Sequence, residues 1–422
     1  MSEENTKSTD VGKRSFFWLN PEWISKGTYF LLVLTLLSGC STFQRIKSNK
    51  LLASADLKNE SFQSVVPIEY ISNLPVFEVT IQGEVYRFIF DTGGYTVFSE
   101  RLTDRLIGLA KPSYIDVKDG NSTVSRINTY FLDELEIGGI TFEKEGFATI
   151  GFTESEWFSC LGLDGTIGPN IMKEALWEVD SQEGHIILSD KSKRLEIVDS
   201  GHTIPLYTDP VFKPSLDLQI GKEIKRVGFD TGFNGFLKLI GKPSSDYLDS
   251  YPSVLRLGNR TNAGNSIVFS DTKMVKLDEM GLNGIVFRNV ITSVGNQFSS
   301  DLLGSQLFDQ YKILIDLSGK ALYLEEFETK PERQTKIESF GFGLDFRAGK
   351  VVIDYVYQPS AAHDMGVKPG QEILKINGRH YAFSSYCEFI ENFQLPMENT
   401  MELELLQEDK PFFVSLTRQT IL

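Results

Sequence analysis

The sequence PVFEVTIQGEVYRFIFDTG at Pro75–Gly93 aligns without a gap with PSLDLQIGKEIKRVGFDTG at Pro214–Gly232. Pro, Ile, Glu, Arg, Phe, Asp, Thr and Gly recur at matching positions of the two stretches. Further along, Leu132–Phe142 is similar to Leu277–Phe287. One Asp-Thr-Gly is a weak signal by itself. Two copies, each at the end of an alternating apolar run, indicate an internal duplication with one Asp-Thr-Gly in each half.

The two aspartates of these motifs, Asp91 and Asp230, are candidate catalytic residues. Two carboxyl groups held a few ångströms apart cannot both ionise, so the pair would share one proton. The ionised member could take a proton from a water while the protonated member hydrogen-bonds a substrate carbonyl. Glycine allows a tight turn, and a threonine hydroxyl could lock the loops together. The residues expected to support the two loops are Thr92, Gly93, Thr231 and Gly232.

These motifs resemble the aspartic peptidases, in the pepsin-like arrangement of two lobes in one chain and with short lobes like retropepsin-like bacterial members. The hydrophobic-hydrophobic-Gly segment of that family is matched by Leu302-Leu303-Gly304 and loosely by Thr166-Ile167-Gly168. The resemblance implies a mainly β fold with a pseudo-twofold pair of β-barrel lobes. It also implies an endopeptidase that acts on polypeptide substrates without a cofactor.

The chain departs from the family pattern directly after each Asp-Thr-Gly. Members usually have Ser, Thr or Ala there, whereas this chain has Gly94 and Phe233. Neither side chain can donate a hydrogen bond to a carboxylate, so we expect raised pKa values for the aspartate pair and an optimum between mildly acidic and neutral pH. The alternative function is a non-catalytic envelope protein that binds peptides at the same site.

Composition excludes several other functions. The 422 residues are 41% hydrophobic and 23% charged, as in globular proteins, and their net charge of −15 argues against a nucleic-acid partner. The four histidines have no metal-ligand spacing, so no metal site is expected. Cys160 and Cys387 are expected to be isolated buried thiols in different domains, with a disulfide between them as the alternative.

The N-terminal residues resemble a bacterial lipoprotein signal. Lys13, Arg14 and Lys26 precede the apolar run Tyr29–Leu37, which ends in Leu-Ser-Gly-Cys at Cys40. The resemblance implies that Cys40 is lipidated and that the protein faces the periplasm from a membrane of the bacterial envelope. Residues 1–40 are then the signal peptide, and residues 41–64 are a tether.

The remaining boundaries follow from the duplication and from charged or proline-containing stretches. The hairpin Val117–Tyr130 is a candidate flap over a substrate, and Arg256–Thr272 is its equivalent in the second half. The alternative is a surface hairpin with no such role. The expected parts are lobe one at 65–189, a lobe connection at 190–203, lobe two at 204–326, a linker at 327–334 and a C-terminal module at 335–422.

The C-terminal module resembles a PDZ domain. The most specific part of the match is Gly366-Val367-Lys368-Pro369-Gly370 followed by EILKINGR at Glu372–Arg379. The resemblance implies a small α/β module that binds a C-terminal peptide, lined by a helix at Phe383–Phe393, with the terminal carboxylate held by a loop. The alternative is a module that only packs on the lobes. The loop residues would be Phe342, Gly343 and Leu344.

Overall fold

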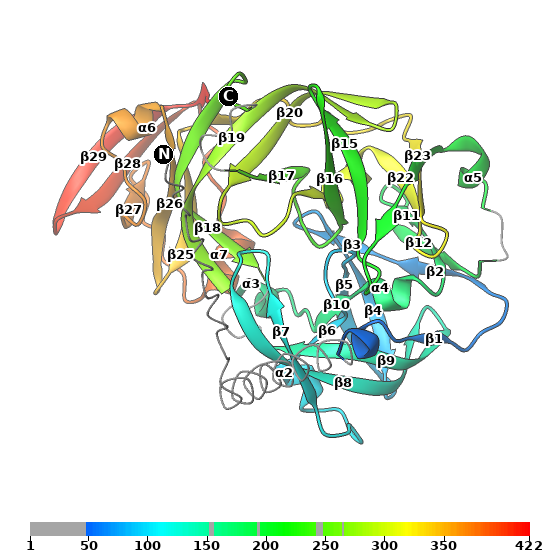
Figure 1. Cartoon of the computed structure of the whole chain (residues 1–422). Helices are drawn as coiled ribbons and strands as arrows, with labels where there is room; N and C mark the ends of the chain where they lie inside the picture. The colour runs from blue at the N-terminus through cyan, green and yellow to red at the C-terminus, as the bar shows by residue number, and fades with distance from the viewer. Residues whose placement is uncertain (1–47, 152–155, 192–194, 242–247, 264–265) are drawn as a thin grey trace, which may run out of the picture. The chain divides into compact units, whose positions relative to one another are not determined.

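The computed structural model describes residues 48–151, 156–191, 195–241, 248–263 and 266–422. Over these residues the chain is mainly β, with two similar lobes and a C-terminal α/β module, which confirms the fold class (Figure 1). The predicted signal segment and its Cys40 lie outside the described residues. Within the described ranges, no helix has the length and apolar character needed to cross a membrane.

Lobe one is built on one large sheet. The six strands from β9 to β8 in the sheet order given below form a closed ring, because β8 also pairs with β9. A small strand, β3 (Glu69–Ile71), pairs with β4 at its side. The strands in sheet order are β1 (Asp56–Leu57), β9 (Ile140–Ile150), β6 (Val97–Ser99), β10 (Gly165–Ile167), β5 (Glu84–Phe90), β4 (Leu74–Ile81), β8 (Val124–Ile137) and β7 (Ser113–Lys118).

Lobe two repeats this plan. Its ring is closed by a pairing between β15 and β19, the counterpart of the close approach of β4 and β8 in lobe one. The duplicated sequence therefore folds twice into one topology. The strands in sheet order are β14 (Tyr207–Thr208), β15 (Pro214–Ile220), β16 (Glu223–Asp230), β21 (Leu302–Gly304), β17 (Leu237–Ile240), β20 (Ile285–Gly295), β19 (Ser266–Leu282) and β18 (Ser253–Ala263).

Matching two-residue turns set the register of equivalent hairpins. Between β8 and β9, Gly138 and Gly139 have φ of 58° and 80°. Between β19 and β20, Asn283 and Gly284 have φ of 42° and 94°. Positive φ at both central residues defines a type I′ turn, whose twist matches that of paired strands.

A third sheet joins the two lobes. Its lobe-one strand β11 pairs antiparallel with lobe-two strand β22, with Trp177 opposite Ile315. The strands in sheet order are β13 (His202–Pro205), β23 (Ala321–Glu326), β22 (Tyr311–Asp316), β11 (Leu176–Asp180), β12 (His185–Ser189) and β2 (Gln63–Pro67). The short helices of the lobes are α2 (Glu100–Thr103), α3 (Glu156–Cys160), α4 (Pro169–Met172), α5 (Ile197–Ser200) and the 3-10 helix η2 (Ser305–Asp309).

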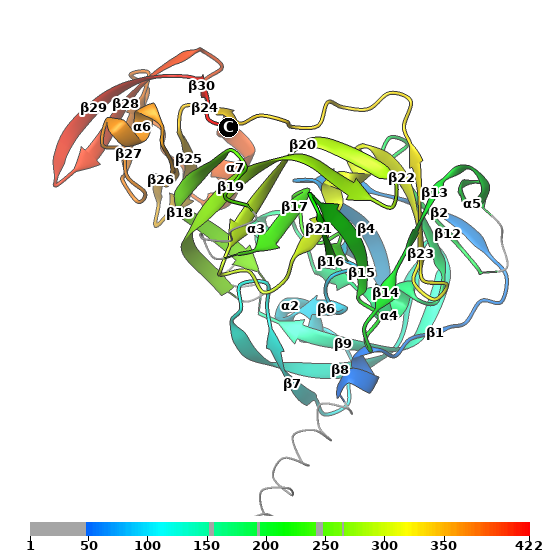
Figure 2. The same ribbon diagram turned by 45° about the horizontal axis from the view of Figure 1, so that its top comes forward.

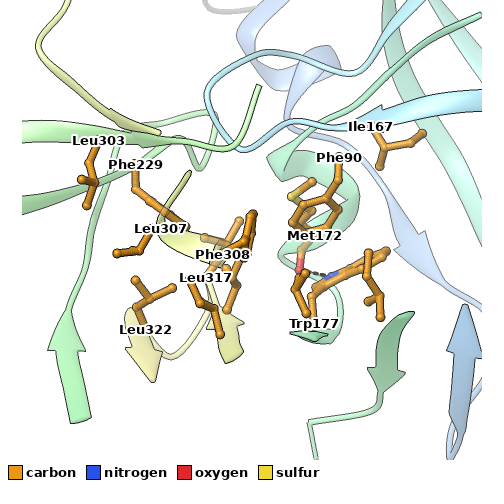
Figure 3. Close-up of a cluster of buried hydrophobic side chains, with 14 of the residues drawn as sticks. Phe90, Ile167, Met172, Trp177, Phe229, Leu303, Leu307, Phe308, Leu317 and Leu322 are labelled. Carbon is orange, nitrogen blue, oxygen red and sulfur yellow. Dashed lines mark hydrogen bonds between the residues drawn. The ribbon is translucent and has the colours of Figure 1, made fainter. Parts of the chain in front are cut away.

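One hydrophobic core runs through both lobes behind the Asp-Thr-Gly loops (Figure 3). Phe90 and Phe229, the residues before the two aspartates, are completely buried in it. The Trp177 indole N–H donates to the carbonyl of Met172 at 2.9 Å, which satisfies the polar atom of this large buried side chain. This packing fixes the base from which both loops project.

The strands and helices of the C-terminal module lie together in Figure 2, and their buried apolar side chains form a separate hydrophobic core. Ser360 and Ser385 cap its two helices by accepting hydrogen bonds from the backbone N–H groups of His363 and Glu388. The elements of the module are β24 (Glu338–Ser339), β25 (Phe342–Arg347), β26 (Lys350–Gln358), α6 (Ala361–Asp364), β27 (Ile373–Ile376), α7 (Tyr386–Asn392), β28 (Thr400–Gln407), β29 (Lys410–Thr417) and β30 (Gln419–Thr420).

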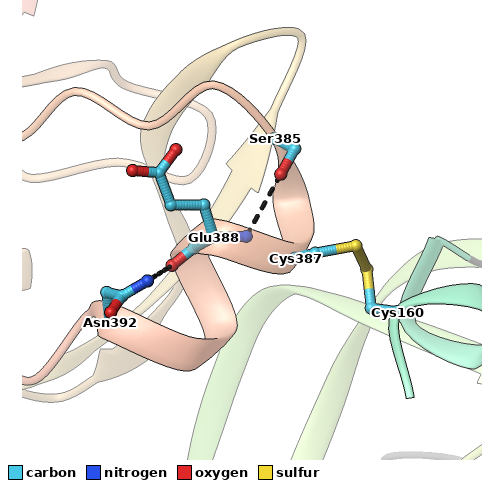
Figure 4. Close-up of a disulfide and its surroundings, with 5 residues drawn as sticks. All are labelled: Cys160, Ser385, Cys387, Glu388 and Asn392. Atoms are coloured by element: carbon cyan, nitrogen blue, oxygen red, sulfur yellow. Dashed lines mark hydrogen bonds between the residues drawn. A yellow bond between two sulfur atoms is a disulfide. The ribbon is translucent and has the colours of Figure 1, made fainter. Parts of the chain in front are cut away.

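The module is attached to both lobes. Its strand β26 pairs with β18 of lobe two, so that β26 and β25 extend the sheet of that lobe. Arg260 on β18 also forms an ion pair with Asp345 on β25, at 3.0 Å. A disulfide between Cys160 on α3 and Cys387 on α7 connects the module to lobe one (Figure 4). The expectation of isolated thiols is therefore wrong, because the docking of α3 on α7 brings together cysteines that are 227 residues apart.

The predicted tether differs from the structure over its described part. Leu51 and Leu52 are buried, β1 pairs with β9, and β2 pairs with β12. Residues 48–64 thus complete the edges of two sheets and do not hang free. Burial of their apolar side chains against lobe one removes apolar surface from water, which stabilises this docked arrangement relative to a free tether.

Candidate active site

Two strand-to-loop junctions with the same construction position Asp91 and Asp230. In lobe one β5 pairs in parallel with β10, with Phe90 opposite Ile167. In lobe two β16 pairs in parallel with β21, with Phe229 opposite Leu303. The hydrophobic-hydrophobic-Gly segments therefore lie beside the Asp loops in both lobes, including the looser match in lobe one.

The two threonines lock the loops together. The Thr92 N–H donates to Thr231 Oγ1 at 3.0 Å, and the Thr231 N–H donates to Thr92 Oγ1 at 3.0 Å. Each hydroxyl in turn donates to the other lobe: Thr92 to the carbonyl of Phe229 at 2.6 Å, and Thr231 to that of Phe90 at 2.7 Å. Both threonines are fully buried, so these four bonds form away from competing water.

The two glycines let each loop approach the carboxyl group of the other. A Cβ added to Gly93 would lie 2.1 Å from Asp230 Cγ, and one added to Gly232 would lie 2.6 Å from Asp91 Cγ. Any side chain at these positions would push the carboxyl groups apart. The structure thus brings Asp91 and Asp230 together across the lobe boundary, with the four supporting residues in contact around them.

The carboxyl groups are held by backbone donors on their own loops. Asp91 Oδ1 accepts from the N–H groups of Gly93 and Gly94, both at 2.9 Å. Asp230 Oδ1 accepts from the N–H of Gly232 at 3.0 Å. The donors fix the orientation of both carboxyl groups, which a shared proton requires.

The proton affinity of Asp91 is high. Its pKa is raised to about 7, first because burial removes water from the carboxyl and second because the charge of Asp230 lies beside it. The Lys213 ammonium and the N–H groups of Gly94 and Gly93 oppose this shift. Near neutral pH the aspartate pair can therefore hold one proton, the state that acid–base catalysis needs.

The residues after the motifs act differently from the sequence-based interpretation. A Cβ at Gly94 would lie 2.4 Å from Asp91 Oδ2, so a serine there would displace the carboxyl group and could not simply donate to it. The half-buried ring of Phe233 packs on the backbone of Gly235 and Gly304. The backbone N–H of Gly94 donates to Asp91 Oδ1, whereas a hydroxyl at position 94 would lie beside Oδ2.

The two candidate flaps are β-hairpins whose ends meet. β7 and β8 form the first, and its Asn121 Nδ2 donates to the carbonyl of Thr261 on β18 at 2.9 Å. Ser122 Oγ donates to the carbonyl of Gln297 at 3.2 Å. Because β18 also pairs with β26, the second hairpin contacts both the first hairpin and the C-terminal module.

The residues predicted to hold a peptide carboxylate are not in a loop. Phe342, Gly343 and Leu344 belong to strand β25, where Phe342 pairs with Val356 and a bulge follows Gly343. The prediction of a capture loop at these positions is wrong in its local structure, because strand pairing with β26 uses one edge of this backbone. Among the described strands, β25 is the last of its sheet.

Sequence reasoning missed three charged side chains that are buried or half-buried. Lys213 and Lys238 lie beside the Asp loops, and Glu145 on β9 is buried in lobe one, where its Oε1 accepts from Asn170 Nδ2 at 2.8 Å. Burial raises the pKa of Glu145 to about 8. A comparison of the two halves could have found the lysines, since lobe one has aliphatic residues at their positions. No group of residues that could hold a metal ion occurs in the described part of the chain.

Comparisons with known proteins give distant likenesses. No protein-family model matches the chain, and no curated protein matches it. The structure is similar to basic 7S globulin from soybean, with 11% identity, 63% of this chain and 95% of that chain covered, and a TM-score of 0.40. It is also similar to conglutin gamma, a unique basic 7S globulin from lupine seeds. The identity is 9%, the match covers 64% of this chain and 96% of that chain, and the TM-score is 0.38.

These comparisons contradict the family assignment made from the sequence. That assignment was a retropepsin-like or pepsin-like peptidase with a PDZ domain in a bacterial lipoprotein, whereas the two structures are named as seed globulins and no family model matches. The assignment is wrong as stated, because a motif as short as Asp-Thr-Gly specifies a loop and not a family. The likenesses are too distant to transfer a function, so the function has to be argued from the residues of the site.

Proposed function

We propose that the protein is an endopeptidase that hydrolyses peptide bonds with a water activated by Asp91 and Asp230. The supporting observation is the facing pair of carboxyl groups, one from each lobe, locked by Thr92 and Thr231. The pKa of about 7 for Asp91 supports a singly protonated pair near neutral pH.

In the proposed reaction the ionised carboxylate takes a proton from the water as the water oxygen bonds to the peptide carbonyl carbon. The protonated carboxyl donates its proton to the carbonyl oxygen, which gives a neutral tetrahedral intermediate. The carbon–nitrogen bond then breaks and the leaving nitrogen takes a proton from the pair, while one hydroxyl of the intermediate gives its proton to the pair as the new carboxyl group forms. The pair returns to one proton, and no covalent enzyme intermediate occurs.

The direct test is incubation of the purified protein with a mixed peptide library at neutral pH, followed by detection of new peptide termini by mass spectrometry. Asp91→Asn/Asp230→Asn is the inactive control, and Asp133→Asn at an exposed position is the matched control for the chemical change. New termini with wild type and Asp133→Asn, and none with the double variant, support the proposal. Peptides that bind without being cut would instead indicate the non-catalytic binding function.

We also propose a peptide site at the free edge of β25. An extended peptide can add a strand to such an edge, and helix α7 lies close to β25 to contact its side chains. Leu344 and Tyr386 contribute partly buried apolar side chains next to this edge. This proposal concerns binding only.

A further inference from the structure

We propose that the site formed by the two aspartates selects peptides with acidic side chains next to the bond that is cut, and that Lys213 and Lys238 bind those side chains. This inference rests on the proposed peptidase function and names the substrate class for it. Four observations support it: the position of each lysine, the lack of an acidic partner, the difference between the lobes, and the charge state of substrates at the working pH.

Lys213 reaches across the lobe boundary toward Asp91. It precedes β15 of lobe two, yet its Nζ lies 4.1 Å from the ring centroid of Tyr95, on the lobe-one loop that contains Asp91. Its charge is one of the groups that lower the pKa of Asp91. The ammonium group is therefore near enough to the aspartates to contact a bound substrate.

Lys238 lies on the other side of the site, beside Asp230. It lies on β17, and its Nζ is 4.8 Å from the ring centroid of Phe233 and 5.3 Å from that of Phe298. Burial lowers the pKa of Lys238, and the charge of Asp230 opposes that shift. The side chain thus places a largely desolvated cation close to the second aspartate.

Neither ammonium group has an ion pair or a hydrogen bond to another residue of the described chain. Lys225, a comparable half-buried lysine of the same lobe, lies 3.1 Å from Asp301. Contacts with aromatic rings compensate only part of the cost of desolvating a cation. A carboxylate from a ligand would supply the missing partner at both positions.

The fold itself does not require lysine at either position. Pairing of the duplicated strands places Leu74 of lobe one at the position of Lys213. Val97, opposite Thr166, takes the position of Lys238, opposite Leu302. Both lobe-one residues are buried aliphatic side chains that serve the same topology. The two cations are therefore additions to lobe two alone.

The chemistry of the aspartate pair is compatible with acidic substrates. A pair that keeps its shared proton up to about pH 7 can work where the Asp and Glu side chains of a substrate are ionised. The protein has a net charge of −15, so most of its surface repels such peptides and the two lysines are a local exception. Selection would then depend on short-range contacts, and added salt should weaken it.

The test uses peptides that differ only by Glu or Gln on either side of one central peptide bond. Binding is measured by fluorescence anisotropy with the Asp91→Asn/Asp230→Asn variant, so that it does not depend on cleavage. We expect the Glu peptide to bind about tenfold more tightly than the Gln peptide, as one short-range charge pair can supply. We expect Lys213→Met and Lys238→Met, in that background, each to reduce the ratio.

Matched variants separate charge from packing. Lys213→Arg and Lys238→Arg should keep the preference for Glu, whereas the exposed Lys222→Met should change nothing. In the active enzyme the methionine variants should raise KM for the Glu peptide more than KM for the Gln peptide.

Equal binding of Glu and Gln peptides, or an unchanged ratio in both methionine variants, would overturn the inference. An equal fall of kcat for both peptides with KM unchanged for both would also overturn it, because the lysines would then only adjust the aspartate pair. Selective binding of Glu peptides in a protein that cuts none of them would refute the peptidase function and leave the charge selection intact.

Discussion

At the scale of single residues, the structure contains carboxyl groups whose ionised form is destabilised by burial. Asp91 and Asp230 face each other, and Glu145 is fully buried on β9 of lobe one. Burial favours the protonated forms of Asp91 and Glu145. Such groups reduce stability at high pH, which is a cost often found at functional sites.

The first prediction concerns the two aspartates. Asp91→Asn and Asp230→Asn should each lower kcat/KM by about 10³-fold or more, because one carboxyl group alone cannot supply both acid and base. Both variants should remain folded, since asparagine keeps the shape and the hydrogen-bond acceptor of the side chain. Kinetics with a cleaved peptide and thermal unfolding would check this. Near-normal activity in either variant would refute the assignment of the pair.

The second prediction concerns pH. Activity should fall on the alkaline side near pH 7, where Asp91 loses the shared proton. The pKa of Asp91 rises from an ordinary value of 3.8 to about 7 in the folded chain, so the folded state binds more protons between these values. Stability must therefore decrease as pH rises through that window, and Asp91→Asn should lessen the decrease. Profiles of kcat/KM and melting temperature against pH would measure both effects.

At the scale of elements, long hairpins connect the parts of the molecule. The β7–β8 hairpin meets the β18–β19 hairpin through Asn121, and β18 continues into the module through β26. The sheet of lobe two therefore ends at β25 of the module. A ligand added to β25 would extend the same sheet that contains the second hairpin.

The third prediction concerns this edge. A peptide that adds a strand with its terminal carboxylate near Phe342 should bind more weakly when its C-terminus is amidated, by about tenfold or more. Leu344→Glu should weaken binding of both forms, because a charge would replace an apolar contact. Isothermal titration with free and amidated copies of one peptide would test this. Equal affinities would show that the edge does not recognise a C-terminus.

At the scale of the whole molecule, the described chain is connected by contacts distant in sequence. The β11–β22 pairing joins the lobes, and the Cys160–Cys387 disulfide joins lobe one to the module. A covalent bond across 227 residues restricts the unfolded chain strongly. Disulfides of this kind form and persist in oxidising environments.

The fourth prediction is that Cys160→Ser/Cys387→Ser lowers the free energy of unfolding by about 2–4 kcal/mol. Reduction of the wild-type protein should produce a similar loss, and the double variant should not respond to reductant. Urea unfolding with and without dithiothreitol would measure both. A wild-type stability that is unaffected by reductant would contradict the role of the disulfide.

The fifth prediction concerns Cys40, for which we propose lipidation. Cys40→Ser should leave an uncleaved precursor that takes up no labelled fatty acid, because the thiol is the acceptor of the lipid. Metabolic labelling and membrane fractionation in a bacterial host would check this, with Cys160→Ser as the matched cysteine control. Wild-type protein in the soluble fraction without an acyl mass would refute lipidation and the proposed location.

The sequence by itself determined the duplicated β architecture and the pairing of Asp91 with Asp230. Apolar alternation and the repeated Asp-Thr-Gly are local signals, and two similar segments fold into similar lobes whose equivalent loops can meet. The same local signals located both hairpins and the small C-terminal module.

Only the tertiary structure decided which distant segments touch. The partner of Cys160, the burial of residues 48–64, the joining of β18 to β26 and the places of Lys213 and Lys238 all depend on such contacts. The residues involved are far apart in the chain, and no local pattern records their pairing. Their positions follow from the packing of complete lobes, because burial and strand pairing are decided by the whole surface that each element meets.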